Sequence, residues 1–146
     1  MLINEDMELL QTSGARTYRI LAIDDDPSST ELTRLALEGA GSYVVREVND
    51  PETAVAEAAS FEPDLVIMDV NMPHLDGRAA ALLIQCDNEP KDIPVLFVTS
   101  MVPEGESTGN NPFGWFGPLA KPVSSSKLAR VVESILVHGV AEFPAE

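Results

Sequence analysis

Short apolar runs alternate with stretches of helical periodicity along most of the chain. The runs are rich in Val, Ile and Leu, and they lie at residues 19–23, 43–48, 65–68, 95–98 and 118–120. Because these runs are apolar on both faces, they indicate strands of a parallel sheet that is covered on both sides. Strands separated by helices in this order predict a doubly wound α/β domain.

Helical spacing predicts which side chains of the intervening helices are buried. For the helix that starts at Asp26-Pro27, they are Leu32, Leu35, Ala36, Gly39 and Ala40. For the helix after residue 77, they include Ala80, Leu83 and Ile84. The last helix has the clearest repeat, with Leu128, Val131, Val132, Ile135 and Leu136.

The ends of two helices carry recognisable stop and start signals. Ser28 and Glu31 form a candidate capping box for the first helix. Ser124 is a candidate N-cap of the last helix, and Gly139 stands where that helix should stop.

One long stretch breaks the alternation of strands and helices. Residues 101–117 combine proline and glycine signals and show no apolar period. They predict an irregular loop where a fourth helix would be expected. We expect one domain at residues 17–139, with an N-terminal tail at 1–16 and a C-terminal tail at 140–146.

Size and charge restrict the class of protein further. A chain of 146 residues fits one domain of ordinary size, and a net charge of −15 argues against direct binding to nucleic acid. The longest apolar runs are too short to span a membrane. A single cysteine, Cys86, excludes an internal disulfide framework, and a reducing, cytoplasmic setting is the default expectation.

Polar side chains follow four of the predicted strands. Asp24 and Asp25 follow the first strand, Asp69 the third, Thr99 the fourth and Lys121 the last. The carboxyl ends of parallel strands share one edge of a sheet, and ligands bind there in such folds. We therefore expect a cluster of carboxylates, one hydroxyl and one ammonium in a single cleft.

Such a cluster suits metal-assisted phosphoryl transfer. Carboxylates at close range repel one another, and a divalent hard cation such as Mg²⁺ relieves this repulsion. An Asp carboxylate can act as a nucleophile and form an acyl phosphate, while Lys121 supplies a counter-charge and Thr99 a hydroxyl donor. Asp26 has a plainer interpretation as the N-cap of the next helix.

Taken together, these motifs resemble the receiver domain of bacterial response regulators. The matching segments are 20–27, 65–77, 94–100 and Lys121-Pro122, and the resemblance covers about residues 17–138. The pattern D-x-x-M-P-x-x-D-G, which starts at Asp69, is its most specific part. The resemblance implies a flavodoxin-like receiver fold with a five-stranded parallel sheet, whose fourth helix is shortened or replaced by the loop.

The resemblance also implies roles for individual residues. Asp69 is similar to the phosphorylation site, and Asp24 and Asp25 resemble the acidic pair that binds Mg²⁺ together with Asp69 and the main-chain carbonyl of Asn71. Thr99 resembles the switch hydroxyl that bonds the phosphoryl group. Pro73 and Gly77 are similar to the turn residues behind the phosphorylation site.

Lys121 resembles the lysine that pairs with the phosphoryl group, and the bond between Lys121 and Pro122 is a candidate cis peptide. One departure concerns the position three before this lysine. The family commonly has an aromatic switch residue there, and this chain has Pro118.

The implied function is that of a signalling relay component and not of an enzyme with its own substrate. A histidine kinase or histidine phosphotransfer protein would donate the phosphoryl group, and a downstream protein would be the target of the output. The domain would catalyse only its own phosphorylation and dephosphorylation.

Two alternatives remain. One is a small Mg²⁺-dependent phosphohydrolase of the haloacid-dehalogenase type, with Asp24 as nucleophile and Asp26 as acid, but it leaves the pattern at Asp69 unexplained. The other is a pseudo-receiver that only binds partners. The presence of Asp69, Thr99 and Lys121 argues against it.

Overall fold

The predicted doubly wound sheet is confirmed. The computed structural model describes residues 16–72, 75–87, 93–100 and 114–139. Its main sheet contains β1 (Tyr18–Ile23), β2 (Tyr43–Val48), β3 (Leu65–Asp69), β6 (Val95–Thr99) and β7 (Trp115–Ala120). The strand order is β2-β1-β3-β6-β7, and all neighbouring strands are parallel.

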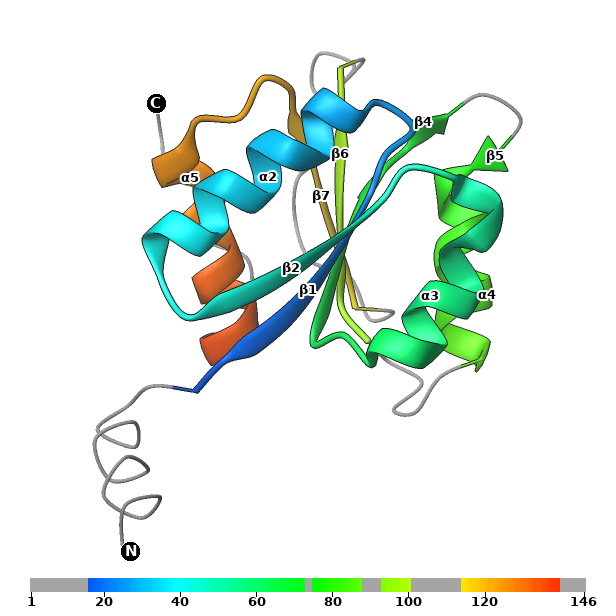
Figure 1. The fold of residues 1–146 in the computed structure, drawn as a ribbon, viewed down its shortest axis with the longest axis horizontal. Helices are drawn as coiled ribbons and strands as arrows, with labels where there is room; N and C mark the ends of the chain where they lie inside the picture. Colours follow the sequence, from blue (N-terminus) through cyan, green and yellow to red (C-terminus); the bar gives the residue numbers. More distant parts are fainter. Residues whose placement is uncertain (1–15, 73–74, 88–92, 101–113, 140–146) are drawn as a thin grey trace, which may run out of the picture.

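Helices cover both faces of this sheet (Figure 1). One face carries α2 (Pro27–Ala40) and α5 (Ser125–Glu133), which continues as the π-helical turn η2 (Ser134–His138). The other face carries α4 (Gly77–Asp87) and α3 (Ala54–Phe61), which follows the 3₁₀ turn η1 (Pro51–Thr53). A two-stranded antiparallel sheet of β4 (Asn71–Met72) and β5 (Leu75–Asp76) follows β3.

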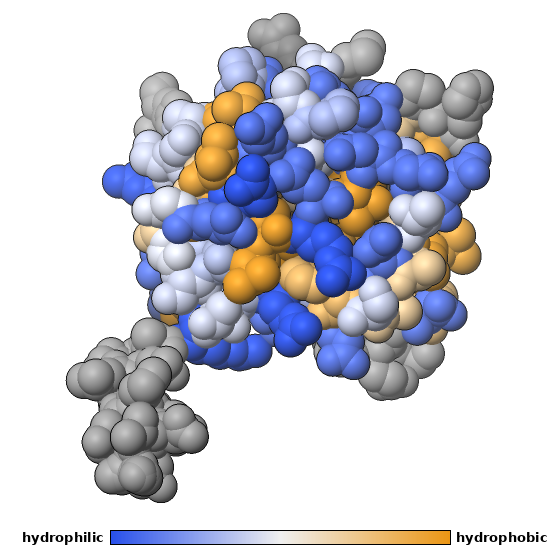
Figure 2. All heavy atoms as spheres, in the orientation of Figure 1, coloured by the Kyte–Doolittle hydropathy of each residue, from blue (hydrophilic) through white to orange (hydrophobic). Residues whose placement is uncertain are grey.

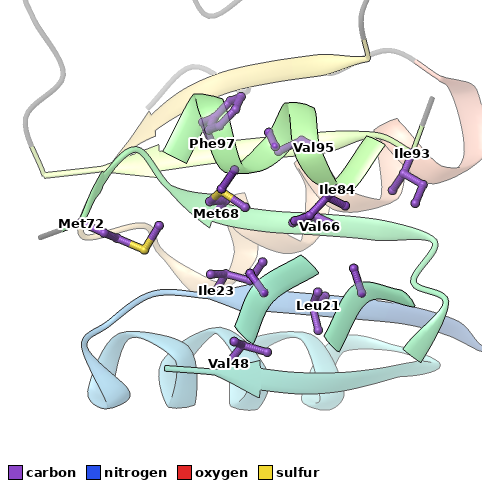
Figure 3. Packing of buried hydrophobic residues seen from close by; sticks show 14 of the residues in the cluster. Leu21, Ile23, Val48, Val66, Met68, Met72, Ile84, Ile93, Val95 and Phe97 are labelled. Carbon is purple, nitrogen blue, oxygen red and sulfur yellow. The ribbon is translucent and has the colours of Figure 1, made fainter. Parts of the chain in front are cut away.

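Alternate side chains of the central strands enter two separate cores. Leu21 and Ile23 of β1 belong to the cluster that α3 and α4 cover (Figure 3), whereas Ile20 and Ala22 belong to the cluster under α2 and α5. All five residues of β3 and of β6 are buried. Burial on both faces explains why these strands are continuous apolar runs in the sequence.

The ends of α2 and α5 show which of the predicted capping residues form the expected hydrogen bonds. Asp26 is the N-cap of α2, and its carboxylate accepts the N–H of Ser28 at 3.1 Å. The predicted capping box is therefore wrong, because Ser28 lies inside the helix. Ser124 and Gly139 are confirmed: Ser124 Oγ accepts the N–H of Lys127 at 3.1 Å, and Gly139 ends the helical stretch with a φ of 75°.

The predicted buried face of α2 is wrong, because four of its five residues are exposed and the fifth is only half-buried; they are Leu32, Leu35, Gly39, Ala40 and Ala36. Leu32 and Leu35 are 67% and 53% exposed, whereas Leu37 is fully buried. In α4, Leu83 is likewise 58% exposed, although Ala80 and Ile84 are buried as expected. Figure 2 shows apolar patches between the polar side chains of one face of the molecule.

Strand β7 starts earlier than predicted. Of the expected loop at 101–117, residues 101–113 lie outside the described part, and Trp115–Gly117 belong to β7. Gly117 has a φ of 94°, and a Cβ atom there would lie 2.6 Å from the carbonyl oxygen of Phe97. The pairing with β6 shifts register at this point. The start of β7 therefore lacks the regular pattern of a strand in the sequence.

Two peptide bonds in this region are cis. They are Gly117–Pro118 and Lys121–Pro122, and the second confirms the prediction. The expected tails lie outside the described residues except for Arg16, whose Nη2 donates to Asp64 Oδ1 at 2.9 Å. In the part of the chain that the structure describes, no helix is long and apolar enough to cross a membrane.

Candidate functional site

The side chains at the carboxyl ends of four strands meet at one edge of the sheet, as predicted. Asp24 follows β1, Asp69 ends β3, Thr99 ends β6 and Lys121 follows β7. Asp24, Asp69 and Thr99 are buried, with exposures of 4%, 7% and 3%, whereas Asp25 is exposed. The edge lies where the strand order reverses, since β1 has β2 on one side and β3 on the other.

Lys121 pairs with both buried carboxylates. Its Nζ lies 2.5 Å from Asp24 Oδ2 and 3.6 Å from Asp69 Oδ2. Burial alone would lower the pKa of Lys121, but the hydrogen bond to Asp24 and the charges of Asp24 and Asp69 outweigh it and raise this pKa. Lys121 is therefore a cation throughout the physiological range.

Asp69 carries a carboxylate in an unfavourable setting. Burial raises its pKa, and the negative charges of Asp24 and Asp25 add to this effect. Lys121 and the N–H of Asn71, which donates to Asp69 Oδ1 at 3.2 Å, lower the pKa but do not compensate. A site that disfavours the charge of its own carboxylate is stabilised by further positive charge.

The arrangement fits a divalent cation. One carboxylate oxygen each from Asp24, Asp25 and Asp69 lies within 4.8 Å of the other two, so one ion can contact all three. Oxygen donors of this kind suit Mg²⁺, which keeps further positions for water and phosphate oxygens. Asn71, whose main-chain carbonyl is the fourth predicted ligand, lies two residues after Asp69 in β4.

Gly77 lies directly behind Asp69, as predicted, but it is the first residue of α4 and not part of a turn. A Cβ atom at this position would lie 2.4 Å from the carbonyl oxygen of Asp69 and 3.0 Å from Cα of Val70. Its N–H donates to the carbonyl of Val70 at 3.0 Å. Only glycine allows α4 to start this close to the end of β3. Pro73, the other predicted turn residue, lies outside the described residues.

Sequence reasoning missed three side chains around the site. The amide of Asn71 donates to Thr99 Oγ1 at 3.1 Å, and the amide of Asn49 donates to the carbonyl of Asp24 at 2.8 Å and to Thr30 Oγ1 at 2.9 Å. A usable signal existed for Asn49. It follows β2 directly, as Asp24 follows β1, so parallel pairing places the two side by side.

Fold and site together define a signalling receiver domain. The sequence profile of the response regulator receiver domain matches residues 20–133, and the chain belongs to this family. The family is a class of signalling domains and not of true enzymes, and its members are found in two-component systems.

Several relatives are similar over most of this chain. The protein PilH of Pseudomonas aeruginosa is 33% identical over 118 residues, which cover 81% of this chain and 97% of PilH. The sensor protein GacS of Pseudomonas syringae is 33% identical over 122 residues, or 82% of this chain. The regulator RpaA of Synechocystis is 39% identical over 83 residues, or 57% of this chain.

The relatives differ greatly in length. The chain spans 13% of GacS and 34% of RpaA, in contrast to its nearly complete coverage of PilH. Among solved structures, the chemotaxis response regulator CheY4 of Vibrio cholerae has a TM-score of 0.71 at 27% identity. The match covers 83% of this chain and 100% of that one, and it shows the same fold.

Proposed function

We propose that this chain is a phospho-accepting receiver domain of a two-component phosphorelay, with Asp69 as the acceptor. The observation that carries the proposal is the position of Asp69: a buried carboxylate at the end of a central strand, with Asp24, Asp25 and Lys121 around it. A carboxylate oxygen of Asp69 attacks the phosphorus of a phosphohistidine. The new O–P bond forms as the N–P bond of the donor breaks.

The acidic side chains have the task of holding Mg²⁺. Asp24, Asp25 and Asp69 would bind it with their carboxylates, and Asn71 with its main-chain carbonyl. When bound, the ion neutralises the charge that develops on the phosphoryl oxygens.

Lys121 and Thr99 are placed to respond to the phosphoryl group. Lys121 Nζ lies 3.6 Å from Asp69 Oδ2. A small movement of this ammonium group away from Asp24 would therefore pair it with an oxygen of a phosphoryl group on Asp69. The hydroxyl of Thr99, which now accepts from Asn71, can donate to the same group. Output then passes to a downstream protein by surface contact, through a change that begins at these two side chains.

A histidine kinase or histidine phosphotransfer protein is the proposed donor. Several relatives, such as GacS, are named as sensor proteins or kinases. A mainly apolar groove opens beside Lys121, between α2 and the first turn of α5. Its lining includes Leu32, Ala36 and Leu128, which gives an incoming protein an apolar contact next to the site.

The geometry disfavours the phosphohydrolase alternative. Asp24 Oδ2 lies 2.5 Å from Lys121 Nζ, whereas Asp69 Oδ2 lies 3.6 Å from it, so the oxygen of Asp69 is the less tightly paired of the two. The side chain of Asp26 caps α2 and accepts from both the N–H and the hydroxyl of Ser28. These contacts support Asp69, and not Asp24, as the acceptor.

The test is phosphorylation by acetyl phosphate with MgCl₂, read by intact mass spectrometry. We expect the wild-type chain to gain one phosphoryl group, Asp69→Asn to gain none, and removal of Mg²⁺ with EDTA to abolish labelling. Asp26→Asn is the matched control, because asparagine also caps a helix and labelling should persist.

Three results would contradict the proposal. Labelling of Asp69→Asn at Asp24 would move the acceptor and favour a phosphohydrolase, as would turnover of an added phosphate ester that Asp26→Asn abolishes. No labelling of the wild-type chain, either by acetyl phosphate or by a phosphorylated histidine kinase, would favour a pseudo-receiver.

A further inference from the structure

Two hydrogen bonds from the end of β2 hold the main chain of Asp24. The N–H of Asp24 donates to the carbonyl of Val48 at 3.1 Å, and the carbonyl of Asp24 accepts from Asn49 Nδ2 at 2.8 Å. The second bond acts on the peptide group between Asp24 and Asp25. The orientation of this peptide decides how the two acidic side chains lie relative to each other.

Asn49 is itself held by a row of side chains between α2 and β2. Its Nδ2 also donates to Thr30 Oγ1 at 2.9 Å, and Thr30 Oγ1 lies 2.8 Å from Glu47 Oε1. Arg34 Nε donates to Glu47 Oε2 at 2.6 Å. Thr30 is 1% exposed, whereas the side chains of Arg34 and Glu47 are 33% and 24% exposed, so the row runs from a partly exposed ion pair to a buried hydroxyl.

Chemistry decides the direction of each hydrogen bond in this row. Arg34 can only donate, and its hydrogen bond, followed by that of Thr30, lowers the pKa of Glu47, whose ionised carboxylate can only accept. Thr30 therefore gives its hydroxyl hydrogen to Glu47 and accepts from Asn49. The carbonyl of Pro27, a competing acceptor for Thr30, lies farther away at 3.1 Å. The other N–H of Asn49 is then left for the carbonyl of Asp24.

We propose that Asn49 is a positioning residue of the acidic metal site, and that Thr30, Glu47 and Arg34 hold it in place. Asn49 acts through the peptide between Asp24 and Asp25 and does not contact the ion. Without it, this peptide can rotate, the carboxylates spread over more arrangements, and metal binding weakens. The inference rests on the proposed function, because it requires that Asp24 and Asp25 bind Mg²⁺.

The test compares the Mg²⁺ affinity of matched variants by titration with MgCl₂, followed by the NMR shifts of backbone amides. We expect Asn49→Ala and Thr30→Val to raise the dissociation constant about tenfold, in line with other residues that orient metal ligands. Thr30→Ser keeps the hydroxyl and should bind like the wild type. The double variant should bind little more weakly than Asn49→Ala alone, because the two residues act in one row.

Arg46→Gln provides a control for general destabilisation. Arg46 also belongs to β2, but it pairs with Glu57 of α3 at 3.1 Å on the opposite face of the sheet. Urea unfolding of every variant in EDTA, without Mg²⁺, separates lost stability from lost affinity. Arg46→Gln should leave the dissociation constant unchanged.

The possible failures are distinguishable. If the wild-type chain binds Mg²⁺ and both Asn49→Ala and Thr30→Val bind it equally well, the positioning role is overturned while the proposed function stands. The same holds if Thr30→Ser or Arg46→Gln weakens binding as much as Thr30→Val does. If the wild-type chain binds no Mg²⁺, the proposed function fails and the positioning role fails with it.

Discussion

At the scale of single residues, the site contains one ammonium group for three carboxylates. Lys121 lies nearer to Asp24 than to Asp69, and Asp25 adds a further negative charge. Burial is the main cause of the raised pKa of Asp69, and the charges of Asp24 and Asp25 raise it further. A divalent cation restores the balance, and a phosphoryl group on Asp69 would then compete with Asp24 for Lys121. The same charges thus support both metal binding and the proposed switch.

The carboxylate of Glu47 should make part of the free energy of unfolding depend on pH. Arg34, and then Thr30, lower its pKa in the folded state. Stability from such a carboxylate is present above its unfolded pKa of about 4.3 and is lost as the pH falls through the lower folded value. We expect Glu47→Gln to lower the free energy of unfolding by about 1 kcal/mol at pH 7.

The measurement is urea unfolding of the wild type and Glu47→Gln at a series of pH values. The difference between them should shrink below about pH 4.3, where the wild type loses the ionised carboxylate. A difference that stays constant down to pH 3 would show that Glu47 stabilises the fold by packing and not by its charge.

At the scale of elements, apolar spacing predicts where the helices lie in the sequence better than it predicts which side of each helix is buried. In α2, the apolar side chains extend around more than one side of the helix. Leu32, Leu35 and Leu37 each have another apolar residue three or four positions away, so helical spacing does not decide which of them is buried. Of these three leucines, Leu37 is the one that is buried, in the core under α2 and α5. Packing against the sheet therefore decides between faces that the period leaves equivalent.

Leucine substitutions in α2 test this rotation. We expect Leu37→Ala to lower the free energy of unfolding by about 2–5 kcal/mol, because it leaves a cavity in the core under α2 and α5. Leu32→Ala, the matched control, removes the same atoms from a side chain that is 67% exposed and should cost less than about 1 kcal/mol. Equal losses in urea unfolding would place α2 in a different rotation.

At the scale of the whole molecule, strand order and charge are the features that matter. The order β2-β1-β3-β6-β7 brings Asp24, Asp69, Thr99 and Lys121 to one edge, although they are distributed over nearly 100 residues of sequence. The chain carries 24 acidic and 9 basic side chains, so carboxylates outnumber their possible cationic partners. Self-repulsion in the folded state follows from this excess.

Screening this repulsion should stabilise the protein. We expect the midpoint of thermal unfolding to rise when NaCl increases from 20 mM to 500 mM, since the Debye length falls to a few ångströms. Circular dichroism in a buffer without divalent cations measures this effect without a contribution from metal binding. A falling midpoint would mean that surface ion pairs such as Arg46–Glu57 outweigh the general repulsion.

The sequence by itself determined the class of fold and the main members of the site. Apolar runs mark buried strands because both faces of a parallel sheet are covered, and the residue after each run must lie at the carboxyl edge. The sequence pattern alone therefore groups Asp24, Asp69, Thr99 and Lys121.

Only the tertiary structure decided the features that depend on side-chain reach and on irregular backbone. The bonds of Asn49 to Asp24 and of Asn71 to Thr99 join residues 25 and 28 positions apart. The order of strands places Asn49 beside Asp24, but it does not predict which atoms of either pair meet. The early start of β7 was hidden because the backbone at Gly117 departs from a regular strand. Local periodicity reports which residues avoid water, whereas contacts between elements depend on the rotation and register that packing alone selects.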